Sequence, residues 1–195
     1  MRHYIFTITL LLTIGILVHS GSAAITTYTD FAQWQSQVGP FTTIGFTEYP
    51  TGTIITDQYA EQGVVFPDGN DFVLNGFPKS FLQDGAGLRD NSTGIVRLTF
   101  SEPLTAIAAH HAGLLATFRL FLNGEMVADT GHMSGGGINF FSGIVSAVPF
   151  DSVTIVDSGI SINLDNIYFG PPIPGPSAFA LLAGGFISQR RRRRP

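Results

Sequence analysis

Hydrophobic and polar residues alternate along short runs of this chain, and Gly, Asn, Asp or Pro interrupts the runs about every ten residues. Alternation with a period of two is typical of half-buried β-strands, and frequent turn residues are typical of a β-sandwich. The pattern predicts strands over residues 41–47, 63–66, 95–100, 104–109, 117–122, 125–129, 152–157 and 160–169.

Two local signals indicate how strands turn or bend. Asn123-Gly124 separates two of the runs and predicts an antiparallel hairpin with a type I′ turn, because both turn residues need a positive φ. In the last run, the apolar residues change parity near Asp165 and Asn166. This change indicates a β-bulge or a strand boundary at that point.

One helix is predicted, over residues 30–38, where Phe31, Trp34 and Val38 share a face. Asp30 is expected to help cap it, and Trp34 to pack it against the strands. Because no helical pattern recurs between the strands, a βαβ architecture and its nucleotide-binding crevices are excluded. The glycines at 135–137 are therefore predicted to form a loop, without the context of a phosphate-binding site.

Residues 1–24 have the features of a secretory signal peptide: a weakly positive start, an apolar run over 5–18, and small residues up to Ala24. The apolar run has about 14 residues, against roughly 20 needed to span a bilayer. Cleavage after Ala24, or one residue earlier, is the predicted outcome. The folded domain is then expected over residues 25–170.

Residues 171–195 combine prolines, an apolar stretch over 178–187 and a terminal cluster of arginines. The arginine cluster follows the positive-inside bias of membrane segments. As an alternative, the arginines form a solvated charge run or a nucleic-acid arm, which leaves the prolines and the apolar stretch unexplained. The residues of this signal are Pro174, Gly175, Pro176, Arg190, Arg191, Arg192, Arg193 and Arg194.

This tail resembles the PEP-CTERM sorting signal of Gram-negative bacteria, although Pro174-Gly175-Pro176 stands where the family has Pro-Glu-Pro. The resemblance implies recognition by an exosortase-type membrane protease. It also implies transient membrane anchoring through a transmembrane helix, removal of the tail, and release to the cell surface or an exopolysaccharide matrix.

The expected folded domain, residues 25–170 and here called the body, is similar to the jelly-roll β-sandwich of many PEP-CTERM proteins. The similarity implies an all-β, jelly-roll-like sandwich of two sheets with one short N-terminal helix. It rests on two segments: Ile44, Phe46, Pro50, Gly52, Thr53, Tyr59, Gly63, Val64 and Phe66 near the start, and Leu164, Asp165, Asn166, Ile167, Tyr168, Phe169 and Gly170 at the end.

Charge and composition argue against several kinds of partner and site. The body carries four basic residues against fourteen acidic ones, a net charge of −10, which argues against nucleic acid as a partner. The absence of cysteine excludes disulfides and cysteine-ligated metals. The chain is 44% hydrophobic and only 12% charged, which is typical of a globular domain and unlike a disordered chain.

Hydrolase motifs are absent from the sequence, and a dispersed Ser-His-Asp triad stays open because its members meet only in space. His110, His111 and His132 are the candidate bases or metal ligands. Neighbouring histidines on a strand point to opposite faces, so one histidine on each face of the sandwich is the favoured interpretation. A glycosidase needs two carboxylates across a cleft, and nothing pairs the available glutamates, which are Glu48, Glu61, Glu102 and Glu125.

A structural calcium ion is the better-motivated chemistry, because Ca²⁺ takes six to eight oxygen ligands and the body has excess carboxylates. Jelly-roll carbohydrate-binding modules often hold calcium between their first and last strands, which implies Glu48 and Asp165 here. As an alternative, Asp165 and Asn166 close a turn by bonding to the backbone. The acid-rich segments 68–71 and 84–90 are predicted turns.

Sugar binding needs exposed aromatic side chains with polar neighbours. Most of the 17 phenylalanines are expected in the core, which leaves Tyr49 and Tyr59 as possible platforms. The sequence thus predicts a non-enzymatic protein exported to the surface or extracellular matrix of a Gram-negative bacterium and associated with exopolysaccharide. The alternatives are a carbohydrate-binding module with a specific glycan ligand and a secreted hydrolase.

Overall fold

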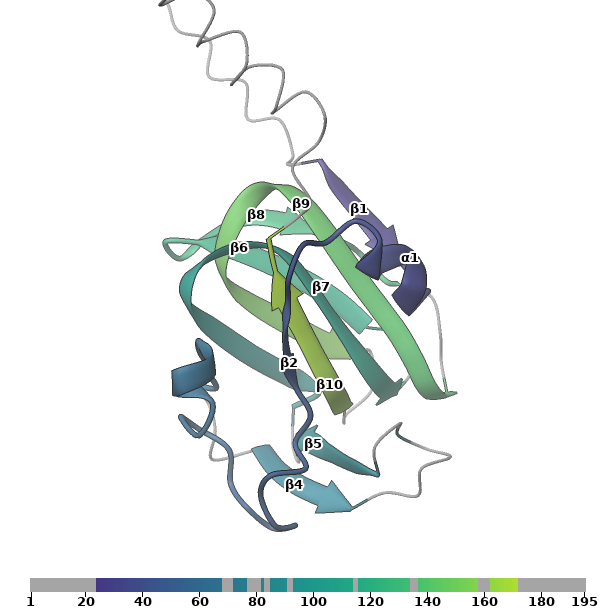
Figure 1. Cartoon of the computed structure of the whole chain (residues 1–195), viewed down its shortest axis with the longest axis vertical. Helices are drawn as coiled ribbons and strands as arrows, with labels where there is room; N and C mark the ends of the chain where they lie inside the picture. Colours follow the sequence, from purple (N-terminus) through teal and green to yellow (C-terminus); the bar gives the residue numbers. More distant parts are fainter. Residues whose placement is uncertain are drawn as a thin grey trace, which may run out of the picture.

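The computed structural model describes residues 24–67, 72–76, 82, 85–90, 93–113, 116–133, 137–157 and 162–171. The signal peptide, except Ala24, and the sorting tail from residue 172 lie outside this description. The elements are β1 Ile25–Tyr28, α1 Phe31–Gln35, β2 Thr42–Ile44, the 3-10 turn η1 Ala60–Gln62, β3 Val64–Val65, β4 Phe72–Gly76, β5 Ala86–Asp90, β6 Ile95–Gly113, β7 Ala116–Leu122, β8 Glu125–Asp129, β9 Gly137–Asp157 and β10 Asn163–Gly170 (Figure 1).

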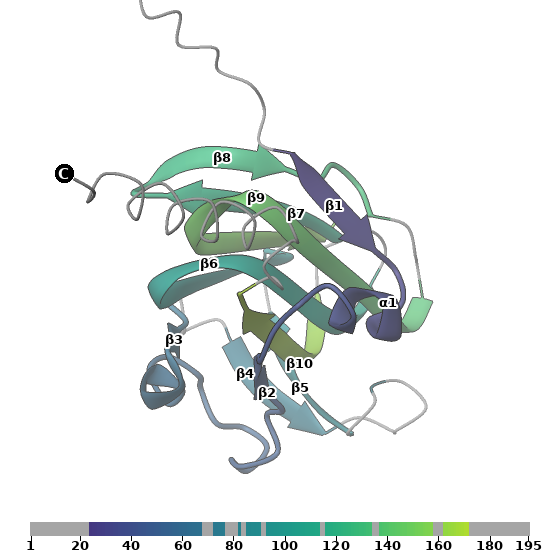
Figure 2. The ribbon, with the colours of Figure 1, turned by 45° about the horizontal axis from the view of Figure 1, so that its top comes forward.

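The strands form an all-β fold, as the alternating pattern predicts, and the fold is jelly-roll-like, as the resemblance implies. All strand pairs are antiparallel, and two layers share the long strands β6 and β9 (Figure 2). The first layer, here called the β7 layer, contains β3, the start of β6, the end of β9, β7 and β8. The second, the β10 layer, contains β4, β5, β10, β2, the end of β6, the start of β9 and β1.

β6 passes from one layer to the other, although the sequence predicts two separate strands in its place. The polar residues Ser101 and Glu102 and the following Pro103 interrupt the alternation, but the backbone continues extended through them. The pairing of β6 with β9 shifts register between Thr99 and Leu104. Register shifts of this kind bend strands and let one strand serve two sheets.

The main core lies between the two layers. It buries side chains from both, including Phe118 and Ile155 of the β7 layer and Ile107 and Ile167 of the β10 layer, all fully buried. These residues occupy alternate positions of their strands, which gives the buried and exposed pattern of a sandwich.

α1 covers the outer face of the β10 layer. Trp34 is fully buried there, packs against Phe141 and Tyr168, and donates from its indole Nε1 to the carbonyl of Ile144 at 3.1 Å. Asp30 caps the helix by accepting from the N–H of Gln33 at 2.8 Å. The predicted packing role of Trp34 is confirmed.

The hairpin and the bulge are also confirmed. β7 and β8 pair across Asn123 and Gly124, whose φ angles are 52° and 84°. In β10 the pairing with β6 shifts between Asp165 and Ile167, and Asn166 between them has a φ of 39°. An inserted residue in a strand leaves its neighbours on opposite faces, which explains the change of parity in the sequence.

Three predictions are wrong in their extent. The helix ends at Gln35, where Ser36 caps it, and does not reach Val38. The segment 84–90, predicted as a turn, contains strand β5, because backbone pairing with β4 and β10 outweighs its turn-forming residues. The segment 41–47 forms a strand only at β2, and Phe46 beyond it takes a positive φ of 59°.

Candidate functional site

The outer face of the β7 layer carries two rows of side chains across β6, β9 and β7. In each row the pairing of the strands places one residue of each strand side by side. One row is Arg97, Thr154 and Arg119, and the other is Thr99, Ser152 and Phe121. All six are exposed or half-buried, while their neighbours Leu98, Leu120 and Val153 are buried in the core. We call these six residues the Phe121 face.

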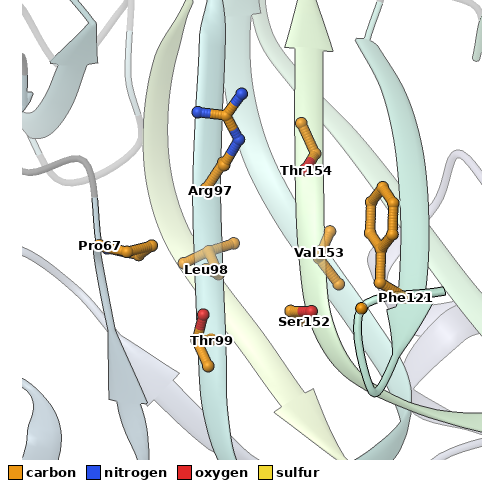
Figure 3. Close-up of a pocket in the computed structure, with 9 residues that line it drawn as sticks. Pro67, Arg97, Leu98, Thr99, Phe121, Ser152, Val153 and Thr154 are labelled. Atoms are coloured by element: carbon orange, nitrogen blue, oxygen red, sulfur yellow. The ribbon is translucent and has the colours of Figure 1, made fainter. Parts of the chain in front are cut away.

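A depression of about 230 Å³ lies on this face (Figure 3). Pro67, which follows β3, and Gly124 of the hairpin turn contribute to its lining, together with Leu98 and Val153 between the two rows. Figure 3 shows the ring of Phe121 on one side and the guanidinium of Arg97 on the other, with Thr154 between their strands. The depression is therefore bordered by an aromatic ring, hydroxyl groups and a cation.

Hydrogen bonds fix the polar border of this face. Ser152 Oγ donates to Asp151 Oδ1 at 3.0 Å, and the N–H of Asn123 donates to Asp151 Oδ2 at 2.7 Å. Arg119 Nε donates to Asp129 Oδ2 at 3.2 Å. Asp151 thus connects the hairpin turn to β9, which holds Phe121 and Ser152 in register.

An exposed apolar side chain extends the aromatic end of the face. Met126 of β8 pairs with Phe121 and is 57% exposed. Phe121 is itself half-buried, although a phenylalanine ring gains most from full burial. The two side chains provide apolar surface beside the hydroxyl groups of Thr99 and Ser152. Such a combination can contact the apolar face of a sugar ring while bonding to its hydroxyl groups.

The two adjacent histidines point to opposite faces of β6, as predicted. His110 lies outside the core among Phe31, Phe141 and Tyr168, with its ring 5.2 Å from that of Phe141. The side chain of His111 is fully buried on the opposite face of β6, and its Nε2 lies 2.9 Å from Ser142 Oγ. The two imidazoles therefore do not converge on one site.

The pair of His111 and Ser142 does not have the features of a hydrolytic dyad. Both residues are fully buried, and Nδ1 of His111 has no hydrogen-bond partner among the described residues. Burial lowers the pKa of His111 to about 4, against an opposing effect of the nearby Asp157 carboxylate. A catalytic triad needs a carboxylate bonded to this nitrogen and a serine that substrate can reach.

The remaining candidate bases and carboxylates stay separate. His132 is exposed, and its Nδ1 lies 3.2 Å from Thr117 Oγ1. Glu61, Glu102 and Glu125 are exposed. Over the residues that the structure describes, no three His, Asp or Glu side chains group around a common point for a metal.

The two predicted calcium ligands lie in different surroundings. Glu48 is exposed, and its Oε2 accepts from the hydroxyl of Tyr59 at 3.2 Å. Asp165 is fully buried at the bulge of β10, where it pairs with His110 of β6. Within the part of the chain that the structure describes, neither residue belongs to a group of three or more His, Asp or Glu side chains that could hold a metal ion. The calcium ion stays a prediction.

The predicted tyrosine platforms do not face solvent together. Tyr59 is 1% exposed and packs edge-on against Phe46, and its burial together with the charge of Glu48 raises the pKa of its hydroxyl. Tyr49 is half-buried and donates to the carbonyl of Gln58 at 3.2 Å. Of the two possible platforms, Tyr59 is excluded, because its ring belongs to the core.

Phe121 is the residue that sequence reasoning missed. The sequence analysis assigned most phenylalanines to the core and therefore did not single out Phe121. The alternation in β7 does contain the signal, because Phe118 and Leu120 face inward and Arg119 and Phe121 therefore face outward. The residues of the sorting signal, from Pro174 to Arg194, and the acid-rich segment 68–71 lie outside the described residues. No helix within the described ranges is long and apolar enough to cross a membrane.

Comparison with known proteins finds solved structures of low similarity to this chain. No family model and no curated protein matches the chain. Similar solved structures include CsCBM6-3 from Clostridium stercorarium in complex with cellobiose, at a TM-score of 0.34, 17% identity, and coverage of 67% of this chain and 94% of that chain. A variant of CBM29-2, a family 29 carbohydrate-binding module, has a TM-score of 0.37 at 14% identity, covering 68% of this chain and 94% of that one.

A catalytic domain is also among the similar structures. The GH87 α-1,3-glucanase in complex with tetrasaccharides has a TM-score of 0.41 at 12% identity. The match covers 71% of this chain but only 29% of the glucanase chain. At such identities the likeness concerns the fold alone, and it transfers neither ligand nor activity.

Proposed function

We propose that this protein is an exported, non-enzymatic protein that binds extracellular polysaccharide through the Phe121 face. The observation that carries the proposal is the pairing of an outward phenylalanine with a row of hydroxyl side chains in one depression. Aromatic surface with a few fixed polar groups is the usual composition of a ligand site for a sugar-sized molecule.

The contrast between the two outer faces supports this choice. The outer face of the β10 layer is covered by α1, which buries Phe141 and Tyr168 and leaves Phe31 and Phe41 partly buried. The β7 layer keeps Phe121 half-buried and Met126 exposed. Apolar side chains left at the surface beside polar ones mark interaction sites more often than isolated apolar residues do.

A non-enzymatic role agrees with the chemistry of the site. The Phe121 face offers Arg, Thr, Ser and Phe side chains, which bind and orient but include no activated nucleophile or paired carboxylates. The buried Ser142 and His111 are inaccessible to substrate. The proposal therefore favours binding over the hydrolase alternative.

The ends of the chain supply the proposed route to the surface. Residues 1–24 would direct export, and the tail from Pro174 to Arg194 would be recognised and removed by an exosortase-type protease. The ten apolar residues 178–187 would span about 15 Å if they were helical, half of a bilayer core of about 30 Å, which suits a transient anchor. The protein would then remain in the exopolysaccharide of a Gram-negative bacterium.

Affinity electrophoresis in gels that contain polysaccharides tests this function. The exported protein should be retarded by at least one polysaccharide, and Phe121→Ala should abolish most of the retardation. Ile54→Ala removes an apolar side chain that is 47% exposed outside the Phe121 face and serves as the matched control. Retardation that persists in Phe121→Ala would place binding elsewhere, and release of reducing sugar or ester products would favour the hydrolase.

A further inference from the structure

We infer that the Phe121 face recognises a polysaccharide that carries carboxylate groups, such as uronic acid units or pyruvate ketals. This inference rests on the proposed function and names its ligand class. It begins from the distribution of positive charge: the body has four basic residues, and two of them, Arg97 and Arg119, lie in one row of this face.

The two arginines flank Thr154 symmetrically. Arg97 of β6 and Arg119 of β7 both pair with Thr154 of β9, which lies between them. Neighbouring strands are about 4.8 Å apart, so the two Cα atoms lie roughly 10 Å apart across the central strand. Each long side chain can reach a group positioned over Thr154, and the threonine hydroxyl adds a donor at the centre.

Guanidinium groups match carboxylates in charge and geometry. Arginine stays protonated at all physiological pH values, and its planar donors bind the two oxygens of a carboxylate in parallel. Arg119 uses its Nε to bond to Asp129, and its terminal amino groups take no part in that bond. The two side chains are 46% and 37% exposed, so this ion pair is weak and leaves Arg119 available to a ligand.

Two described acidic groups beside this face, Asp129 and Asp151, already accept hydrogen bonds. Asp129 accepts from Arg119 and, through Oδ1, from the N–H of Gly131 at 2.7 Å. Asp151 accepts from Ser152 and Asn123.

The arginine row lies next to the aromatic row. Successive residues on one face of a strand are about 7 Å apart, which is the separation between Arg119 and Phe121 along β7. This distance is close to the width of one sugar ring. A sugar that contacts Phe121 would therefore direct a substituent on its far side toward Thr154 and the two arginines.

Pairs of polysaccharides that differ only in their carboxylates test the inference. The full chain, purified in a detergent without sugar groups, is titrated with alginate, polygalacturonate, hyaluronan and xanthan and with the carboxyl-reduced form of each. Neutral glucans are titrated in parallel. We expect at least one acidic polysaccharide to bind, and its reduction to weaken binding about tenfold, since charge-assisted hydrogen bonds are lost.

Variants separate local recognition from overall charge. Arg97→Gln and Arg119→Gln should each weaken binding of the acidic form severalfold and weaken binding of its reduced form much less. Arg89→Gln removes the same charge from an exposed position of β5 in the other layer and should leave both affinities unchanged. Trp34 fluorescence verifies that each variant is folded.

The outcomes distinguish this inference from the proposed function. Equal binding of an acidic polysaccharide and its reduced form, or binding of neutral polysaccharides alone, would overturn the inference and leave polysaccharide binding intact. If no acidic, reduced or neutral polysaccharide binds, both the inference and the proposed function fail.

Discussion

Acid should destabilise this protein through one buried histidine. His111 is fully buried against Ser142, and burial lowers its pKa to about 4 from an ordinary value of 6.5. Between these two values the unfolded chain binds a proton that the folded chain does not. Above about pH 6.5, His111 is neutral in both states and does not lower the free energy of unfolding. As the pH is lowered from there, the free energy of unfolding falls, and the full loss due to His111 is reached at about pH 4.

The size of the effect follows from the two pKa values. Each pH unit in this window removes up to about 1.4 kcal/mol, so the whole window removes about 3 kcal/mol from the free energy of unfolding. That is a large part of the roughly 5–15 kcal/mol that stabilises a typical domain. The effect should therefore be visible above the titration of surface carboxylates.

Urea unfolding between pH 7 and pH 4, followed by fluorescence of the single tryptophan, measures it. Trp34 is fully buried, so unfolding exposes it to water. His111→Gln removes the titrating group and keeps an amide that can bond to Ser142. The difference in unfolding free energy between the wild type and this variant should change by about 3 kcal/mol over the pH range.

Ser142→Ala provides the control, because it removes the hydrogen-bond partner and keeps the imidazole. This variant should be less stable by about 1–3 kcal/mol at pH 7, and its stability should still fall with pH. If the wild type and His111→Gln lose stability in parallel as the pH falls from 7 to 4, the burial argument for His111 is refuted.

Three further predictions concern packing, metal binding and sorting. Gly143→Ala should cost about 1–3 kcal/mol, because a Cβ there would lie 2.6 Å from Trp34 Cδ1, while Gly76→Ala, with its nearest contact at 3.6 Å, should be nearly neutral in urea unfolding. Calcium at about 100 times its dissociation constant should add roughly 2.7 kcal/mol if Glu48 and Asp165 bind it, and identical melting midpoints with calcium and with chelator would remove the site. Replacing the arginines from 190 to 194 by serine should delay removal of the tail without shifting the melting midpoint, and mass spectrometry that finds Pro195 on mature surface protein would contradict the sorting signal.

Local conformational requirements made parts of the fold predictable. The hairpin at Asn123 and Gly124 follows from the positive φ of both residues, and the bulge follows from the parity change beside Asn166. β5 was not predictable in the same way. Its Ala, Gly and Asp residues have low strand propensity, and it is a strand because the preceding strand β4 and the distant strand β10 supply backbone partners on its two sides.

The candidate site was less predictable than the fold. The alternation in β7 places Arg119 and Phe121 on one face, but the sequence does not tell which strands lie beside it. The partners Arg97 and Ser152 are contributed by β6 and β9, and only the pairing of these strands brings the two rows together. A surface assembled from three strands requires the topology as well as the pattern.

Isothermal titration of the protein with extracellular polysaccharide from the organism that produces it tests the central claim most directly. The account predicts saturable binding that Phe121→Ala weakens about tenfold, the effect of losing the apolar contact of one half-buried ring. The Ile54→Ala control should bind like the wild type. Equal affinities for wild type and Phe121→Ala, or no binding by the wild type, would contradict the assignment of polysaccharide binding to this face.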